Sequence, residues 1–180
     1  MSNVSLGFVG LGAIGLPMAA NLVSAGFNLR VHTPSRKAEK DSRLKGSISC
    51  SSPKEVARGC DIFFVCVSDD EAIEEVLFSS QGAYENLKQK SLVIDLSTIS
   101  PSKSRTLAQR LAEKNITYID APVTGGTEGA ESGTLTMFLG CKDQLLKQIT
   151  TYLSPIASNI YCFSKVGKGQ EVKAINQILV

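Results

Sequence analysis

Three glycines near the amino terminus have the spacing of a phosphate-binding turn. Gly10, Gly12 and Gly15 form a Gly-x-Gly-x-x-Gly sequence between an apolar run that ends at Val9 and a helical pattern that begins at Ile14. The first glycine permits a tight turn, the second lets the backbone approach a pyrophosphate, and the third lets the helix pack close to the strand. The N–H groups at the helix N-terminus then face the phosphate charge. This context predicts a dinucleotide-binding turn; a glycine-rich turn that binds nothing is the alternative.

Strands and helices alternate along the chain, and these elements must position the turn. Apolar runs predict strands over residues 4–9, 28–32, 47–50, 61–67, 91–95, 116–120, 134–139 and 159–162. Helical patterns cover residues 14–25, 69–77, 100–114 and 142–153, with further helices beginning at Ser52-Pro53 and near Gln170. The alternation implies an α/β fold of the Rossmann type: a doubly wound, mostly parallel sheet with helices on both faces.

Three polar clusters follow predicted strands, at the edge of the sheet where such folds bind ligands. They are residues 68–70, Ser97-Thr98 and Thr124-Gly125-Gly126. Paired glycines expose backbone N–H groups and the threonine adds a hydroxyl, a combination that suits a carboxylate. The first cluster is interpreted only as a helix cap.

The composition excludes several other classes of function. The 180 residues carry a net charge of +2, so no electrostatic case for nucleic acid binding exists. His32 is the only histidine, which argues against a histidine-based metal site or a Ser-His-Asp triad, and no metal is expected. The five cysteines are scattered, which favours reduced thiols. No membrane span or secretory signal is visible, so a cytoplasmic protein is expected.

Four motifs occur in order: residues 8–18, 95–101 (Asp-Leu-Ser-Thr-Ile-Ser-Pro), 120–126 (Asp-Ala-Pro-Val-Thr-Gly-Gly) and 167–177 (Gly-Lys-Gly-Gln-Glu-Val-Lys-Ala-Ile-Asn-Gln). On these motifs the chain resembles the β-hydroxyacid dehydrogenase family, which includes 3-hydroxyisobutyrate dehydrogenase, tartronate semialdehyde reductase and threonate dehydrogenase. The family also includes the related 6-phosphogluconate dehydrogenases, and the chain resembles the NADP-binding domain of that superfamily. Members of the family continue the last helix into an all-helical domain. The resemblance therefore implies a Rossmann domain over residues 1–165 and the start of an interdomain helix over 166–180, with the C-terminal all-α substrate and dimerisation domain missing.

The resemblance also implies a reaction, the transfer of a hydride between NADP(H) and a small 3-hydroxyacid or its semialdehyde or 2-oxo counterpart. Lys173 would be the general acid/base, and a homodimer or tetramer is expected for a full-length protein. The residues implied to bind substrate are Thr124, Gly125, Gly126, Asn176 and Gln177. A helix places residues three and four apart on one face, so Lys173 and the last two can share a pocket.

Two positions depart from the usual family pattern. Thr124 stands where serine is usual, which keeps the hydroxyl but adds a methyl group. Gln177 stands where many members have a second asparagine, and the Asn-Gln pair favours tartronate semialdehyde or threonate as substrate.

The stretch after the second predicted strand bears on the choice of cofactor. NAD-binding versions often place an acidic residue there, and residues 31–37 contain none. Thr33, Ser35, Arg36 and Lys37 can instead meet a phosphate, so NADP(H) is expected over NAD(H), with Arg36 at the 2′-phosphate. The expected cofactor-binding residues are Gly10, Leu11, Gly12, Ala13, Ile14, Gly15, Thr33, Ser35, Arg36, Val67 and Thr98.

Two other functions stay open. A non-catalytic NADP-binding or oligomerisation module of the same family would lack turnover, although the presence of Lys173 argues against it. A 6-phosphogluconate dehydrogenase would need a sugar-phosphate pocket, and the short sequence around Lys173 fits that reaction less well.

Overall fold

The central element of the fold is a parallel sheet. The structure is a computed structural model and describes residues 4–179. Within them, strands β1 (Leu6–Val9), β2 (Leu29–His32), β3 (Ile48–Ser49), β4 (Ile62–Val65), β5 (Leu92–Asp95) and β6 (Thr117–Asp120) pair in the order β3-β2-β1-β4-β5-β6. All five pairings are parallel, and Val9 is in register with both His32 and Val65. The carboxyl ends of β1, β2 and β4 therefore meet at one edge, where the strand order reverses.

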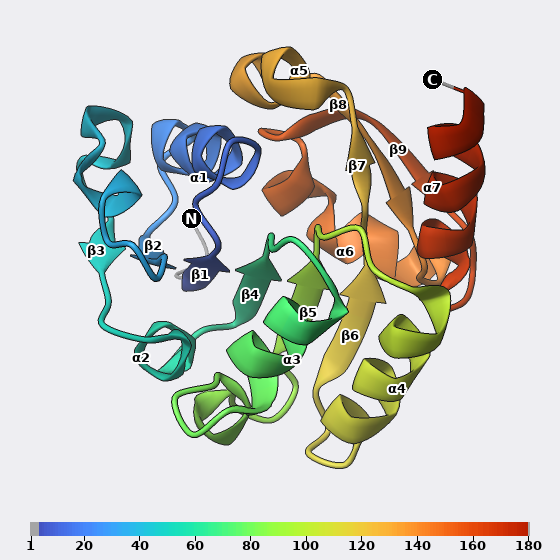
Figure 1. The fold of residues 1–180 in the computed structure, drawn as a ribbon, viewed down its shortest axis with the longest axis horizontal. Coiled ribbons are helices and arrows are strands. Elements are labelled where there is room, and N and C mark those ends of the chain that lie inside the picture. Colours follow the sequence, from blue (N-terminus) through green and yellow to red (C-terminus); the bar gives the residue numbers. More distant parts are fainter. Residues whose placement is uncertain (1–3, 180) are drawn as a thin grey trace.

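Helices cover both faces of this sheet, as predicted (Figure 1). Helix α1 (Gly15–Ser24) packs in the apolar core of one face. Helices α2 (Pro53–Ala57), α3 (Asp70–Phe78) and α4 (Pro101–Ala112) pack in the core of the other. The side chains of Ser52, Asp69 and Ser100 accept backbone N–H groups at the starts of α2, α3 and α4. These caps are visible in the sequence, which explains why the helix starts were predicted closely. Short 3₁₀ helices cover Ala38–Lys40, Ser42–Leu44 and Tyr84–Asn86.

A second, smaller sheet stands beside β6. Strands β7 (Val123–Thr124), β8 (Leu135–Leu139) and β9 (Ala157–Cys162) form it, with β7 antiparallel and β9 parallel to β8. Helix α5 (Gly126–Ser132) connects β7 to β8, and α6 (Asp143–Leu153) connects β8 to β9. The sequence predicted β8, α6 and β9 but neither the separate sheet nor β7 and α5. Gly125, at φ 128°, starts α5 without a side-chain cap, so the usual start signal is absent there.

Helix α7 (Lys168–Leu179) ends the described chain and lies against β6, β8 and α4. It begins two residues before the predicted start. Ile175, Ile178 and Leu179 on this helix are 61%, 83% and 78% exposed, so its last turns have an uncovered apolar side. Among the described residues no helix is both long and apolar enough to cross a membrane.

Candidate active site

The glycine-rich turn after β1 has the geometry of a phosphate-binding loop. Gly10 has φ 97°, and a Cβ atom there would collide with the carbonyl oxygen of Cys66. A Cβ atom on Gly15 would collide with the Gly10 carbonyl, so the helix could not approach the strand. A Cβ atom on Gly12 would instead meet open space, and Gly12 and Ala13 are exposed. The turn is thus tight at its first and third glycines and open at the second, which fits a pyrophosphate resting on its backbone.

A cleft of about 490 Å³ opens on one side of this turn. Gly10, Val67 and Val76 contribute to its walls, together with His32 and Pro34 at the end of β2. Its mostly apolar walls suit a flat aromatic group.

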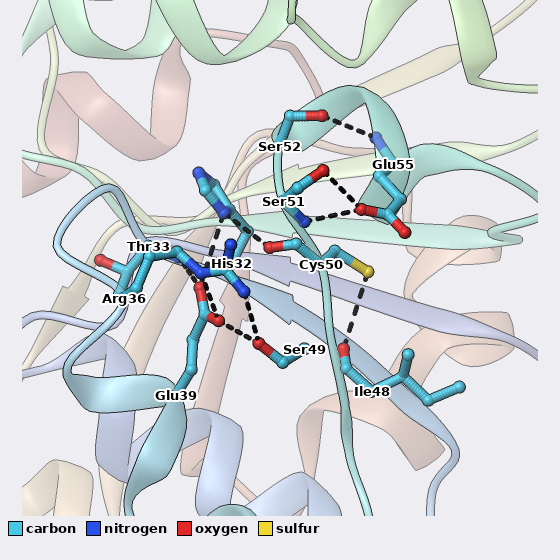
Figure 2. A network of polar contacts seen from close by, with 10 residues as sticks. All are labelled: His32, Thr33, Arg36, Glu39, Ile48, Ser49, Cys50, Ser51, Ser52 and Glu55. Atoms are coloured by element: carbon cyan, nitrogen blue, oxygen red, sulfur yellow. Dashed lines mark hydrogen bonds and ion pairs between the residues drawn. The ribbon is translucent and has the colours of Figure 1, made fainter.

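The end of β2 holds a polar cluster that the sequence analysis missed. The backbone turns back after Pro34, so that Glu39 reaches the strand end (Figure 2). Glu39 accepts a hydrogen bond from the Thr33 N–H at 2.9 Å. It also forms an ion pair with Arg36, whose Nε lies 2.7 Å from the carboxylate. The Ser49 hydroxyl also donates to this carboxylate. Thr33 is buried, whereas Ser35 and Arg36 are exposed.

Glu39 is ionised in this cluster. Burial opposes its charge, but the hydrogen bonds from Ser49, the Thr33 N–H and Arg36 outweigh it, so its pKa lies below the usual value. The only sequence signal for this contact is the three-residue spacing of Arg36 and Glu39, which also occurs between many unpaired surface residues.

A second cleft, of about 550 Å³, opens on the other side of the turn and unites the predicted catalytic lysine with most of the predicted substrate-binding residues. The predicted residues that line it are Ile14, Val67, Thr98, Thr124, Gly125, Gly126, Lys173 and Gln177. These residues come from the first turn, the ends of β4 and β5, the β7–α5 connection and α7. Residues that line it without having been predicted are Cys66, Ser68, Leu96, Ser97, Val123 and Leu135.

Lys173 is the buried cation of this cleft. It is 7% exposed, and burial alone lowers its pKa below the usual value. Within residues 4–179 no carboxylate lies within ion-pair distance of its ammonium group. A lysine in these surroundings can exchange a proton more readily than one on the surface.

Asp120, at the end of β6, holds the helix that carries Lys173. Its carboxylate accepts the backbone N–H groups of Gly167 at 2.8 Å and Gln170 at 3.0 Å, which fixes the start of α7. Burial raises the pKa of Asp120, against the effect of these hydrogen bonds. A Cβ atom on Gly169 would collide with the Phe138 carbonyl, so the helix lies against β8.

Gln170 joins α7 to the loop that contains Thr98. Its amide nitrogen donates to the Ser97 carbonyl at 2.8 Å, and its amide oxygen accepts the Ile99 N–H at 3.2 Å. Asp120 and Gln170 both lie in motifs noted above, but no role was predicted for either. The contacts of these two residues link positions 47 to 73 apart, a relation that a sequence pattern alone does not reveal.

The strand ends beneath the second cleft are fixed by buried polar contacts. Asp95 accepts the Ser97 N–H at 2.9 Å and the Tyr118 hydroxyl at 2.6 Å. Burial raises the pKa of Asp95 to about 7, although these hydrogen bonds act in the opposite direction. The Ser97 hydroxyl in turn accepts the Val67 N–H at 2.9 Å, which ties the end of β4 to the loop after β5.

Some predicted residues line neither cleft, among them Leu11 and Asn176. Leu11 is buried under the turn. Asn176 is absent from the walls of the second cleft, and its buried Oδ1 atom has no hydrogen-bond partner among the described residues. No group of three or more His, Cys, Asp or Glu side chains in residues 4–179 is arranged to hold a metal ion.

Comparison with known proteins identifies the family. The sequence model described as the NAD binding domain of 6-phosphogluconate dehydrogenase matches residues 5–165. The chain belongs to this family.

Its relatives include dehydrogenases and reductases of hydroxyacids, as the motifs predicted. The chain is 35% identical to 2-(hydroxymethyl)glutarate dehydrogenase of Eubacterium barkeri, over 99% of this chain and 59% of that protein. It is 36% identical to 2-hydroxy-3-oxopropionate reductase of Escherichia coli, over 98% of this chain and 60% of that protein. Psf3, solved in complex with NADP⁺ and 2-OPP, superimposes with a TM-score of 0.91 at 27% identity, over 97% of this chain and 62% of that one. The chain thus spans about three fifths of the length of these relatives.

Proposed function

We propose that this chain is the nucleotide-binding part of an oxidoreductase that moves a hydride between NADP(H) and a small 3-hydroxyacid or its semialdehyde or 2-oxo counterpart. The observation that carries the proposal is the position of Lys173, buried in the cleft that Thr98 and Thr124 also line. The hydroxyacid-oxidising relatives support the reaction class.

The chain's own residues would divide the work between binding and proton transfer. The nicotinamide cofactor, when bound, supplies or accepts the hydride. The turn from Gly10 to Gly15 would hold the pyrophosphate, while Val67 and Thr98 would meet the nicotinamide ribose end. Thr124 and the N–H groups of the two following glycines would hold the substrate carboxylate, with Gln177 beside it. Asn176 lies on the same helix but outside the walls of the cleft, and its buried Oδ1 atom is proposed to contact the substrate.

Lys173 would move the proton. In the reducing direction its ammonium group donates a proton to the carbonyl oxygen as the alcohol forms. In the oxidising direction the neutral amine accepts the hydroxyl proton. Burial lowers the pKa of Lys173 and so makes the neutral form more accessible, which supports both roles for one residue.

NADP(H) is the proposed cofactor, with Arg36, Ser35 and Thr33 at the 2′-phosphate. The exposure of Ser35 and Arg36 supports this assignment, because both can reach a ligand. The full use of Glu39 by protein donors also supports it, since this carboxylate cannot easily accept ribose hydroxyls. A homodimer or tetramer is proposed for a full-length protein. The exposed apolar side chains of Ile175 and Ile178 on α7 support an interface on this helix.

The substitution Lys173→Ala tests the catalytic role. A suitable protein is a chimera in which α7 continues into the C-terminal part of 2-hydroxy-3-oxopropionate reductase, assayed by the loss of NADPH absorbance with small semialdehydes. We expect Lys173→Ala to lower turnover about 100-fold or more, because a positioned acid/base contributes that much. The affinity for NADPH, measured by calorimetry, should change less than about twofold, since the lysine contacts substrate.

Three results contradict the proposal: equal loss of turnover and NADPH affinity, full activity of the variant, or an inactive parent chimera that binds NADPH. The last result favours the non-catalytic nucleotide-binding module.

A further inference from the structure

Glu39 places a buried negative charge next to the cation expected to read the cofactor phosphate. Its side chain is only 2% exposed, whereas that of Arg36 is 46% exposed. Arg36 uses Nε for Glu39 and one terminal nitrogen for the Ser49 hydroxyl, at 2.7 and 3.0 Å. The rest of the guanidinium group is left facing solvent. The pair therefore has a formal charge of zero, although the exposed half of it is positive.

This pair is close in the chain to residues that line the cleft suited to an aromatic base. His32 and Pro34 line that cleft from the end of β2, and Ser51 and Ser52 line it from the segment after β3. Thr33, which follows His32 in the chain, donates its N–H to Glu39 (Figure 2). Arg36 is the more exposed partner of the pair, so a ligand group that projects from this cleft toward β2 can reach Arg36 more easily than Glu39.

The carboxylate of Glu39 is fully engaged. One oxygen accepts the Thr33 N–H and lies 3.5 Å from His32 Nδ1, and the other accepts Arg36 and Ser49. Because both oxygens are occupied, Glu39 is a poor acceptor for ribose hydroxyls, unlike the acidic residue at this strand end in many NAD-binding folds. Its effect on a ligand is therefore electrostatic, and salt screens a charge this buried only weakly.

We propose that Glu39 is a specificity-determining residue whose charge offsets that of Arg36 and so limits the preference for the 2′-phosphorylated cofactor. The inference rests on the proposed function, since it takes the cleft to be the adenosine site. NADPH carries a phosphate at this position and NADH a hydroxyl. A charge at Glu39 therefore acts on the first cofactor and hardly on the second.

The substitution Glu39→Gln tests this assignment in the chain itself. Glutamine keeps an oxygen that can accept the Thr33 N–H and loses the negative charge. We expect NADPH to bind about fivefold more tightly than to the wild type, and NADH to change less than about twofold, in calorimetric titrations of both cofactors.

Ser49→Ala is the matched control. It removes the contacts of the Ser49 hydroxyl with Glu39 and Arg36 but changes no charge. The ratio of the NADPH affinity to the NADH affinity should therefore stay within about twofold of the wild-type ratio. If Glu39→Gln does not fold, the effect of the Glu39 charge can be measured in a background that lacks the Arg36 charge. The double variant Arg36→Gln/Glu39→Gln should then bind NADPH more tightly than the single variant Arg36→Gln.

Weaker NADPH binding in Glu39→Gln with unchanged NADH binding would overturn the proposal, because it would mean that Glu39 holds Arg36 in its working position. Equal changes for both cofactors, or the same change in Ser49→Ala, would overturn it as well and indicate a purely structural role. A wild type that prefers NADH would contradict the proposed cofactor but not this inference, which depends only on the change from wild type to variant.

Discussion

At the scale of single residues, the proposed chemistry depends most on Lys173. A surface lysine titrates at about 10.4, and burial in the second cleft lowers the pKa of this one. The shift comes from desolvation alone, because no charged partner within the described residues holds the ammonium group.

This shift predicts the pH dependence of the proposed reaction. Oxidation needs the neutral amine, so its rate should rise with pH through the lowered pKa and level off above it. Reduction needs the ammonium form and should fall over the same range. Profiles of kcat/KM in both directions, measured on the chimera, should therefore each have a midpoint at a pH below about 10.4. A midpoint at or above that value, or a profile that Lys173→Arg leaves unchanged, would contradict the role of this lysine.

The sequence was informative about residues in short local motifs and uninformative about those that act through long-range contacts. Lys173 and Thr124 could be selected because each stands in a motif, and both line one cleft. Glu39 was missed because the chain must turn back after Pro34 to bring it to β2. Asp120 and Gln170 were not assigned roles because their partners are distant in the sequence.

At the scale of elements, the position of α7 brings Lys173 and Gln177 into the second cleft. Asp120 holds the start of this helix through two backbone N–H groups. The side chain of Gln170 ties the helix to the loop after β5. Gln170 is 1% exposed, so its amide groups satisfy backbone groups that water cannot reach.

The substitution Gln170→Ala should therefore loosen α7 relative to Thr98. It leaves the Ser97 carbonyl and the Ile99 N–H without their partner, which costs about 1–3 kcal/mol of unfolding free energy. Turnover of the chimera should fall more than its affinity for NADPH. Urea unfolding and steady-state kinetics measure the two effects.

Glu171→Gln is the control on the same helix. This partly exposed residue pairs with Arg105 and Lys168, and losing its charge should cost less stability than the Gln170 substitution. If both variants lose equal stability and activity, α7 is not held through Gln170.

Elements with strong local signals were predicted and those without were not. The starts of α2 and α4 have a capping serine followed by proline, and both helices begin there. Helix α5 has neither signal, and β7 is only two residues long. Their pairing with β8 depends on contacts across the fold, so the separate second sheet could not be predicted from patterns along the chain.

At the scale of the whole molecule, the two clefts lie on either side of the glycine-rich turn and share Val67. This arrangement matches an elongated ligand with an aromatic group at each end and a charged centre. The division at residue 165 into a Rossmann domain and the start of an interdomain helix stays a prediction, as does the cytoplasmic location.

Calorimetric titration of the 180-residue chain with NADPH and NADH tests the central claim most directly. We expect one NADPH per chain, bound about tenfold more tightly than NADH because Arg36 meets the 2′-phosphate. Binding of neither cofactor would contradict the claim that the two clefts form a nucleotide site. Tighter binding of NADH would retain the site and contradict its proposed preference.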